Sequence, residues 1–219
     1  SMPSKPYRLA TTFPDASGGT GLLGVGFVVE NDVFEQWVSE DQSYFRVLRP
    51  YIVGKDLNAR VNDNPPRHVI DFGEMSELEA EAYPLAIGRI RELVKPQRDV
   101  LTRQIHEECY WKHWDKREKL YASLNPLNQV LACSFVSKHL IYDFLPKGWI
   151  YSKQLAVVPT ESFADFATLQ STIHEVWARY YSATLETRLS YSISDGLRTY
   201  PMPRTEDGRI DQTGKRYFE

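Results

Sequence analysis

Several features are scarce in this sequence, and each shortage narrows what the chain can be. The two cysteines, Cys109 and Cys133, form no CxxC pair, which argues against a disulfide framework or a zinc site and favours a reducing cytoplasm. The longest apolar run, LLGVGFVV at 22–29, is far too short to span a membrane. No secretory signal is visible, and Ser1 before Met2 resembles a cloning scar, so we expect a piece of a longer cytoplasmic protein.

Catalytic signatures are also few, and the clearest is incomplete. Asn64-Pro65-Pro66-Arg67 resembles the Asn-Pro-Pro-aromatic tetrapeptide with which amino-group DNA methyltransferases hold a flipped base. That signature needs an aromatic residue where this chain has Arg67, and it follows a buried strand, whereas the preceding LNARVND is polar. A proline-rich surface turn that leads into a strand explains both departures, and we predict such a turn.

Two further motif fragments lack their structural context. Residues 19–24, GTGLLG, match GxGxxG, but a Thr/Pro/Ser-rich loop precedes them and a strand-like segment follows, whereas a nucleotide site needs a strand and then a helix. His174-Glu175 begins like HExxH, but Ala178 stands at the fifth position and excludes that zinc motif. No paired carboxylates or nucleophile-and-base set stands out. We therefore expect no catalytic residue, no metal and no cofactor in this chain.

Length and pattern predict one mixed α/β or α+β domain, because 42% of the 219 residues are hydrophobic and helical and extended patterns alternate. We expect an irregular lead-in over 1–20, a domain over 21–203, and a polar linker or the start of a next segment over 204–219. The predicted strands are short and mostly antiparallel or mixed: 22–31, 44–54, 67–72, 129–137, 139–145, 148–159 and 187–194. Three or four helices are expected: 32–40, a helix from 77 that is kinked at 84, 96–119 and 160–183.

Local signals place several helix ends. Asn31 or Asp32 can cap the first helix, and Ser76-Glu77-Leu78-Glu79 has the form of a capping box. Pro84 should kink or restart the helix that follows this box. Pro96 can serve as the first residue of the long helix.

The helix over 160–183 has the clearest periodicity. Thr160 or Ser162 can cap its start. An apolar stripe predicts one core-facing side: Phe166, Leu169, Ile173, Val176 and Tyr180. Because they share this helix, three large polar side chains should brace the domain rather than contact a ligand: His174, Trp177 and Arg179.

Charge is unevenly distributed, although the net charge of −3 by itself says nothing of nucleic acid. Residues 46–68 carry five basic and two acidic side chains, and residues 71–81 carry five acidic ones and no basic one. A basic segment next to an acidic one can indicate a binding face beside a solvated face. It can also indicate a surface on which basic and acidic side chains form salt bridges with each other. The segment 96–119 carries three aromatic residues among basic ones: Tyr110, Trp111 and Trp114. Such a segment can clamp nucleic acid, or its aromatic side can face the core. The acidic residues of the same segment favour the core-facing alternative.

A polar and basic stretch lies between two strand-like runs. In CSFVSKHLIY, short side chains can reach phosphates or base edges: Ser134, Ser137, Lys138 and His139. From the residues alone, the chain is a mixed α/β domain with a basic edge that can bind an anion or a nucleic acid.

Six segments taken together resemble one known family. They occur in the family's order: RVLRPYIVGKDLN (46–58), RHVIDFGEMSELEAEAYP (67–84), RELVKPQRD (91–99), LACSFVSKH (131–139), LQSTIHEVWAR (169–179) and YSISDGLRTYPMP (191–203). The likeness covers about residues 20–203. The family is the target recognition region of single-chain restriction–modification proteins, the MmeI-like or type IIL adenine methyltransferases. One departure is Gly196-Leu197-Arg198, where the family usually has an aromatic residue.

The resemblance implies a target-recognition-domain fold and sequence-specific recognition of double-stranded DNA. In the family, the catalytic methyltransferase domain lies N-terminal to this region and carries the Asn-Pro-Pro-aromatic loop and the S-adenosylmethionine site. Some members also carry a nuclease. The expected partners are therefore duplex DNA and the parent's own methyltransferase domain, with no membrane, and this fragment alone should not transfer methyl groups.

Candidate DNA contacts follow from residue type, local charge and the family segments. For phosphates we expect Arg46, Arg49, Lys55, Arg60 and Lys138, and for base edges Asn58, Arg67, Ser134, Ser137 and His139. Arg49 could instead be structural, beside Pro50-Tyr51. Two other readings stay open: a protein-docking module of a defence complex, and a complete small methyltransferase that uses Asn64-Pro65-Pro66.

Overall fold

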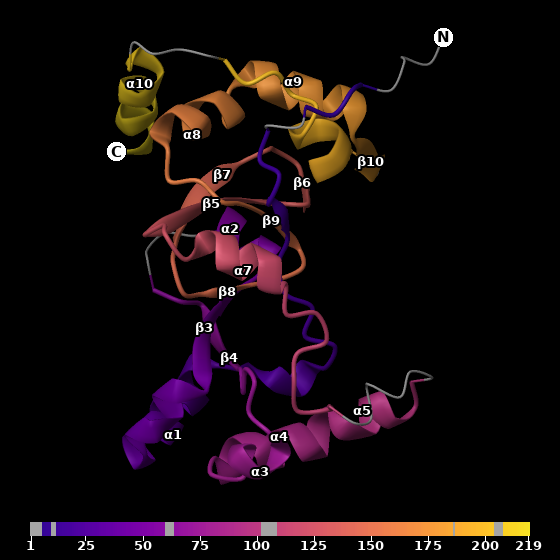
Figure 1. Ribbon diagram of the computed structural model, residues 1–219, viewed down its shortest axis with the longest axis vertical. Coiled ribbons are helices and arrows are strands. Elements are labelled where there is room, and N and C mark those ends of the chain that lie inside the picture. Colours follow the sequence, from indigo (N-terminus) through magenta and orange to yellow (C-terminus); the bar gives the residue numbers. More distant parts are fainter. Residues whose placement is uncertain (1–5, 10–11, 60–63, 102–108, 186, 204–207) are drawn as a thin grey trace.

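The computed structural model describes residues 6–9, 12–59, 64–101, 109–185, 187–203 and 208–219. Two halves are stacked along the long axis of the molecule (Figure 1). The lower half comprises residues 22–53, 64–101 and 109–113. The upper half comprises residues 12–19, 54–58 and the described residues from 118 onward. No described helix is long and apolar enough to cross a membrane.

The lower half is built on a four-stranded sheet of order β2-β4-β3-β8. Its strands are β2 (Val28–Val29), β4 (Arg67–Ile70), β3 (Leu48–Ile52) and β8 (Ile150–Tyr151). The first three pair antiparallel, whereas β8 comes from the upper half and pairs parallel with the end of β3. Pro50 is opposite His68 of β4 and precedes the two residues of β3 that pair with β8, so it lies outside the part of β3 that has a strand on both sides.

Helices cover this lower sheet, and local capping explains most of their ends. They are α1 (Asn31–Glu40), α3 (Glu77–Ala80), α4 (Pro84–Leu93) and α5 (Lys95–Asp99), with 3₁₀ turns η1 (Val25–Phe27) and η2 (Gln42–Arg46). The predicted capping box is confirmed, because Ser76 Oγ accepts from Glu79 N–H while the Glu79 carboxylate accepts from Ser76 N–H. Pro84 begins α4, also as predicted.

The predicted cap of α1 is wrong. Glu30 is the residue before the helix, and no side chain caps it. Asn31 is instead used across the fold: its amide donates to the Pro65 carbonyl at 3.1 Å, and its Oδ1 lies 3.1 Å from His68 Nδ1. The proline-rich stretch predicted as a turn therefore lies against the start of α1 and leads into β4.

The upper half has a second four-stranded sheet of order β1-β9-β5-β7, antiparallel throughout. Its strands are β1 (Ser17–Gly18), β9 (Leu155–Val158), β5 (Gln129–Ser134) and β7 (Tyr142–Pro146). Both faces are buried, because α8 (Phe163–Leu169) and α9 (Thr172–Tyr181) lie on one side and α2 (Gly54–Asn58) and α7 (Glu118–Leu124) on the other. Leu131 and Cys133 of β5 thus face one core, and Val130 and Ala132 face the other.

A third, smaller sheet has the order β10-β11-β6. Its strands are β10 (Ala183–Leu185), β11 (Arg188–Ser190) and β6 (Val136–Ser137), followed along the chain by a π-helical turn η3 (Ile193–Leu197). The expected fold class, a mixed α and β domain with short, mostly antiparallel strands, is confirmed. There are more helices than the three or four expected, since several are only one or two turns long.

The long helix predicted over 96–119 is wrong. Helix α5 ends at Asp99, residues 102–108 lie outside the described part of the chain, residues 109–117 are irregular, and α7 begins at Glu118. The reason is a buried arginine. Arg98 Nη1 donates to the carbonyls of Cys109 and Lys112, which a helix would have used for its own hydrogen bonds.

The helix predicted over 160–183 is two helices. Ser162 caps α8 as predicted, but Ser171 caps a second helix, α9, by accepting from His174 N–H. The apolar stripe is therefore split. Its first residues, Phe166 and Leu169, are buried, whereas the others are 74%, 63% and 60% exposed: Ile173, Val176 and Tyr180.

Two more segments differ from expectation. The strand predicted over 22–31 shrinks to β2, because η1 occupies residues 25–27 and α1 begins at Asn31. The polar stretch expected as a linker contains α10 (Arg209–Phe218), which packs closely on α8. Gly214 permits this approach, since a Cβ there would lie 2.0 Å from the Phe163 carbonyl oxygen.

Candidate nucleic-acid interface

The fold brings two of the predicted contact segments together. The start of α2 lies against the end of β5, so closely that a Cβ on Gly54 would be 2.6 Å from Ser134 Oγ. Gly54 N–H also donates to Gln154 Oε1 at 3.3 Å. This packing leaves the side chains of Lys55 and Asn58 exposed on the surface beside β5.

The turn after β6 completes this surface. Ser137 is buried and its hydroxyl donates to the His139 carbonyl, while Ser134 donates to a carbonyl two residues further on at 3.2 Å. Arg179 of α9 donates to the Lys138 carbonyl at 2.6 Å. The serines therefore shape the turn, and the side chains of Lys138 and His139 are exposed. We call the surface formed by Lys55, Asn58, Lys138 and His139 the α2–β6 face.

Arg67 lies behind this face and is held in an ion pair. Its Nη2 lies 2.8 Å from Asp56 Oδ1, and both side chains are mostly buried. The other Asp56 oxygen accepts from Val53 N–H at 3.1 Å, so the pair fastens α2 to β4. Arg67 Nε is buried and has no hydrogen-bond partner among the described residues. A base contact by Arg67 would therefore require its guanidinium to leave Asp56.

The remaining arginine candidates lie elsewhere. Arg46 is exposed at the end of η2, and Arg49 of β3 donates to the Gly148 carbonyl at 3.1 Å. The two arginines line a shallow hollow together with acidic side chains: Asp71, Glu74 and Glu79. They form a group separate from the α2–β6 face, and Arg60 lies outside the described residues. The bond to Gly148 gives Arg49 the structural role that the sequence left open.

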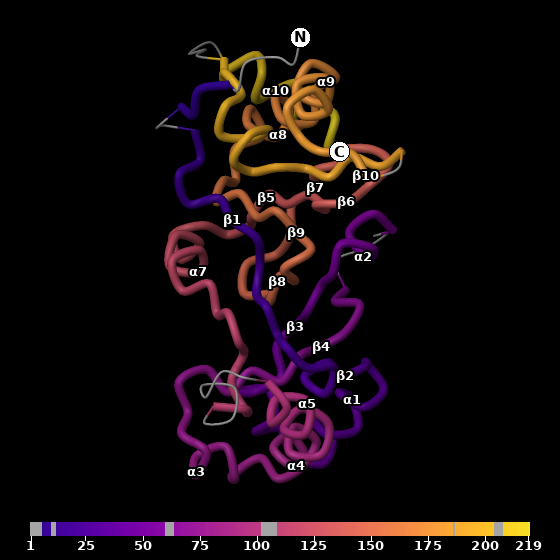
Figure 2. Tube along the Cα trace, turned by 90° about the vertical axis from the view of Figure 1, so that its right-hand side faces the viewer, coloured from indigo at the N-terminus to yellow at the C-terminus, as the bar shows by residue number. Residues whose placement is uncertain are grey.

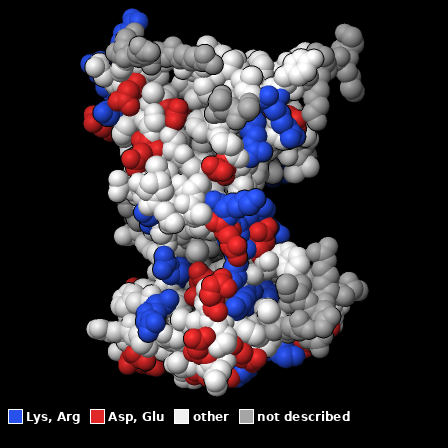
Figure 3. Space-filling view, viewed as in Figure 1, with Lys and Arg blue, Asp and Glu red and all other residues white. Residues whose placement is uncertain are grey.

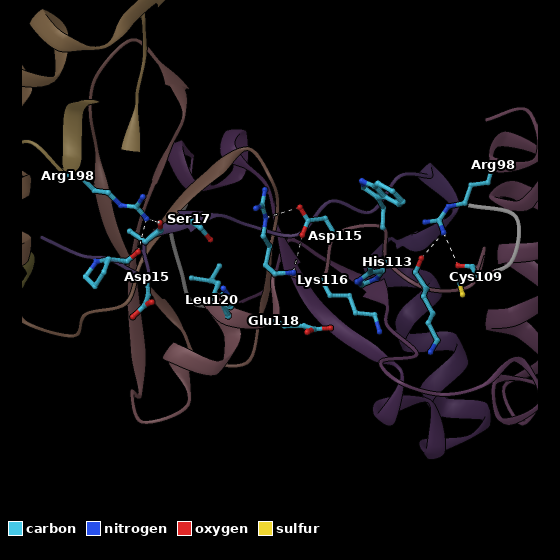
Figure 4. A pocket seen from close by; sticks show the side chains of 16 residues that line it. Asp15, Ser17, Arg98, Cys109, His113, Asp115, Lys116, Glu118, Leu120 and Arg198 are labelled. Atoms are coloured by element: carbon cyan, nitrogen blue, oxygen red, sulfur yellow. Dashed lines mark hydrogen bonds and ion pairs between the residues drawn. The ribbon is translucent and has the colours of Figure 1, made fainter. Parts of the chain in front are cut away.

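A larger hollow of about 670 Å³ lies at the waist between the two halves (Figure 4). Basic and acidic side chains are mixed on this face of the molecule (Figure 3). Several of its cations donate to backbone carbonyls: Lys112 to Glu74, Lys116 to Gly73, Arg117 to Gly19, and Arg198 to Pro14 and Ala16. The fold thus uses them to fasten the lead-in and the 109–117 segment.

Arg98 is the most deeply buried of these cations, at 2% exposure. Besides Cys109 and Lys112, its guanidinium donates to the carbonyls of Leu22 and Leu23. Burial lowers its pKa to about 10, so it stays protonated at pH 7. We conclude that the waist is a structural joint rather than an open anion site.

The glycines of the GxGxxG match serve close packing. A Cβ on Gly19 would lie 2.1 Å from the Tyr151 carbonyl oxygen, and Gly24 has φ +152° with Val94 2.8 Å from its Cβ position. The element that follows directly is the short 3₁₀ turn η1 (Val25–Phe27), and the first α-helix after it, α1, begins only at Asn31. Within the described ranges, no three His, Cys, Asp or Glu side chains group as metal ligands do.

The side chains expected to brace the domain make internal contacts. His174 is fully buried, and its Nδ1–H donates to the Leu169 carbonyl at 2.7 Å while Tyr191 donates to its Nε2. Trp177 donates to Thr199 Oγ1 at 3.1 Å. The aromatic stripe of the 96–119 segment is also mainly a core feature, because Tyr110 and Trp111 are buried and Trp114 is partly exposed.

Two surface features were missed at the sequence level. The exposed apolar side of α9, formed by Ile173, Val176 and Tyr180, was expected to be core. The hairpin of β10 and β11 was expected as a single closing strand, and it lies on the same side of the molecule as α2 (Figure 2). An exposed arginine, Arg188, begins β11.

Comparison with known proteins agrees with this architecture. The family model for the MmeI target recognition domain matches residues 18–204. A solved structure of the type IIL restriction-modification enzyme MmeI in complex with DNA shares the fold, with a TM-score of 0.79 and 18% sequence identity, over all of this chain and 29% of that chain. No curated protein matches the sequence. Because the family model spans most of its length, the chain belongs to the family of MmeI target recognition domains.

Proposed function

We propose that this chain recognises a specific sequence in double-stranded DNA as the target recognition domain of a restriction–modification protein. The family match over residues 18–204 carries the proposal. The similar MmeI structure supports it, since that protein was solved in complex with DNA. The chain spans 29% of the MmeI chain, so the activity of the whole protein is a separate part of the proposal.

Recognition takes place on the α2–β6 face. Lys55 and Lys138 are exposed cations that can neutralise phosphates and fix the register of the domain on the duplex. Asn58 and His139 are exposed beside them, and an asparagine amide can pair with both major-groove edge atoms of adenine. Ser134 and Ser137 act through the shape of the turn, and Arg67 through the position of α2. Arg46 is a second, separate phosphate contact, whereas Arg49 is held at the Gly148 carbonyl.

In the whole protein, a separate N-terminal catalytic domain binds S-adenosylmethionine and methylates adenine N6 in the cytoplasm. Some parents of this type also cleave DNA. The fragment itself transfers no methyl group, because Asn64-Pro65-Pro66 lies against the start of α1 and Arg67 begins β4, so the stretch is not a base-holding loop. A calorimetric titration with S-adenosylmethionine should give no heat, and measurable binding would favour the small-methyltransferase reading.

The direct test is fluorescence anisotropy of this chain with a random-sequence duplex over a salt series. Neutralisation of phosphates predicts that the logarithm of the affinity falls linearly with the logarithm of salt concentration. Selection of a preferred sequence from the same pool should follow. No binding at the lowest salt, together with no binding by the full-length parent, would contradict the proposal.

A protein-docking role is the second candidate, and the exposed side of α9 favours it. Ile173, Val176 and Tyr180 form an apolar stripe of the kind that marks protein contacts. In a target recognition domain this stripe would pack on the rest of the parent chain. Substitution of Val176 by Asp should then weaken association with a separately expressed catalytic part and leave DNA binding by this chain unchanged.

A further inference from the structure

The segment between β6 and β7 is held by side chains rather than by a neighbouring strand. Residues 138–141 belong to no strand of the described structure. Three consecutive carbonyls nevertheless accept hydrogen bonds from side chains: Lys138 from Arg179 at 2.6 Å, His139 from the Ser137 hydroxyl, and Leu140 from Gln170 at 3.3 Å. The backbone of this segment is therefore fixed at three successive residues although it lies outside the sheets.

Two of these donors come from the helices that lie above β6 and β7 (Figure 1). Gln170 directly follows α8, and Arg179 lies in the last turn of α9. The Gln170 amide also accepts from Tyr142 N–H at 2.7 Å, so it holds the segment at two points. Arg179 is oriented in turn, because Glu175 accepts from its Nε at 3.0 Å and from its Nη2 at 2.7 Å. A guanidinium fixed in this way by a carboxylate is a rigid donor.

Burial separates the side chains of the segment into two groups. Leu140 and Tyr142 are each 3% exposed and pack in a core cluster with residues of α8 and α9. Lys138 and His139 are exposed and belong to the α2–β6 face. Because the carbonyls of both exposed residues are bound, their side chains leave the backbone from fixed points.

We propose that Arg179 and Gln170 are positioning residues for DNA recognition, which hold Lys138 and His139 in their DNA-bound arrangement before DNA is bound. The inference rests on the proposed DNA-recognition function and on the α2–β6 face as its site. A contact made by a flexible segment loses affinity, because the segment must be ordered on binding, and ordering it beforehand removes that cost. Neither positioning residue has to touch the duplex, since each acts on the backbone of the segment.

A direct phosphate contact by Arg179 is the alternative, because its side chain is 36% exposed. The bonds that it already makes favour positioning, since Nε and Nη2 donate to Glu175 and to the Lys138 carbonyl. The two roles differ in a measurable way. Positioning acts only through Lys138 and His139, whereas a direct contact would be independent of them.

The test is a double-mutant cycle on this 219-residue chain. Arg179→Gln is made alone and in a chain that already carries Lys138→Ala and His139→Ala. Affinity for one fixed duplex is measured by fluorescence anisotropy at a single salt concentration. Gln170→Met, which is neutral and of similar length, is taken through the same cycle.

The matched control is Lys215→Gln. Lys215 of α10 pairs with Asp211 four residues earlier, at 3.1 Å, as Arg179 pairs with Glu175. Helix α10 and strand β6 lie on opposite sides of the upper half (Figure 1). Loss of this cation should therefore leave DNA affinity unchanged.

Arg179→Gln alone should weaken binding about 10-fold, because the exposed part of the segment must then be ordered on binding. Gln170→Met should weaken it by a smaller factor, since the side chains of Leu140 and Tyr142 remain buried. In the chain that lacks the Lys138 and His139 side chains, each substitution should change affinity less than about 2-fold. Arg179→Lys keeps a charged donor and should restore part of the affinity.

A measurement without DNA separates positioning from loss of the fold. In Arg179→Gln, the backbone amide resonances of Lys138 and His139 should shift or broaden. In Gln170→Met, hydrogen exchange at Tyr142 N–H should become faster. The midpoint of urea denaturation should change little in either variant. If Arg179→Gln does not fold, Gln170→Met and Arg179→Lys complete the cycle.

Failure of the proposed function and failure of this inference give different results. If the unmodified chain and its parent bind no DNA, the proposed function fails. If the chain binds DNA and Arg179→Gln weakens binding equally with and without the Lys138 and His139 side chains, Arg179 is a direct contact and the positioning assignment alone is overturned. The assignment is also overturned if Arg179→Gln leaves binding intact, or if removal of the Lys138 and His139 side chains does not weaken it.

Discussion

The interior of the lower half and the α2–β6 face of the upper half use their basic side chains differently. In the lower half, Arg98 is buried and bonded to four carbonyls, and Arg89 donates to the carbonyls of Gly26 and Val28. On the α2–β6 face of the upper half, the side chains of Lys55 and Lys138 are exposed. The difference shows that a cluster of positive charge does not by itself indicate a binding face. What matters is whether backbone acceptors of the same chain already occupy the donors.

The largest expected effect on stability comes from replacing a buried cation of the lower half. Arg98→Met should lower the free energy of unfolding by about 4 kcal/mol, because buried carbonyls lose their donors and the joint at the waist loosens. Urea denaturation followed by circular dichroism measures this. The matched upper-half variant, Lys138→Met, should stay within about 0.5 kcal/mol of the unmodified chain. Similar losses for the two variants would contradict the contrast between the halves.

The next effect concerns the contact of α10 with α8. Gly214→Ala should lower the free energy of unfolding by about 2 kcal/mol, since the added Cβ would collide with the Phe163 backbone and displace the helix. Gly208 is a useful control for glycine content, because nothing lies within 4 Å of its Cβ position, although its φ of +67° favours glycine. Asparagine adopts this left-handed conformation more readily than most residues, so Gly208→Asn should lower the free energy of unfolding much less than Gly214→Ala. Chymotrypsin cleavage near Tyr217 would report whether α10 detaches.

Acid should weaken both halves through buried histidines. Burial lowers the pKa of His174 in the upper half to about 4, and burial lowers the pKa of His113 in the lower half. The unfolded chain therefore binds more protons below pH 6.5, so stability falls as the pH drops from about 6.5 toward 4. At pH 5 His174 alone should account for a loss of about 2 kcal/mol relative to pH 7.

A pH series of urea denaturations tests this, with His174→Gln as the comparison. The variant should be less stable at pH 7 but should lose less stability between pH 7 and pH 5. An unchanged pH slope in the variant would show that His174 does not titrate as its burial predicts. The remaining slope would belong mainly to the lower half, where His68 is also buried.

The variant that should change stability least should change DNA binding most clearly. Lys138→Ala should weaken binding to all duplexes alike and reduce the salt slope by about 1, because one phosphate contact is lost. Its unfolding free energy should be unchanged, since the side chain is exposed. An effect confined to one DNA sequence would indicate a base contact instead and would change the role assigned to this residue.

Local signals in the sequence predicted local structure well. The capping box at Ser76, the helix start at Pro84 and the strand that begins at Arg67 depend on neighbouring residues, and all are confirmed, although the strand ends at residue 70 rather than 72. The long helix over 96–119 failed because its end is set by Arg98, whose acceptors Leu22 and Cys109 are remote or follow later in the chain. No periodicity in that segment reveals a partner 76 residues away.

In the candidate site, features that depend on neighbouring residues could again be predicted from the sequence, whereas contacts between distant segments could not. Exposure of Lys138 and His139 follows from a polar turn between two buried strands, and the sequence indicated that turn. The ion pair of Arg67 with Asp56 did not follow, because it depends on how α2 packs against β4. The hairpin of β10 and β11 was missed for a different reason: TRLSYSIS shows one strand, and its partner β10 is only three residues long and closely follows a helix.

The parallel pairing of β8 with β3 bears on the order in which the protein folds during synthesis. Tyr51 and Ile150, which pair across these strands, are 99 residues apart in the chain. At about 5–20 residues per second, β8 leaves the ribosome roughly 5–20 s after β3. Throughout that interval the nascent lower half has an open sheet edge that another strand or a chaperone can occupy. Translation speed between residues 52 and 150 should therefore influence the yield of native protein.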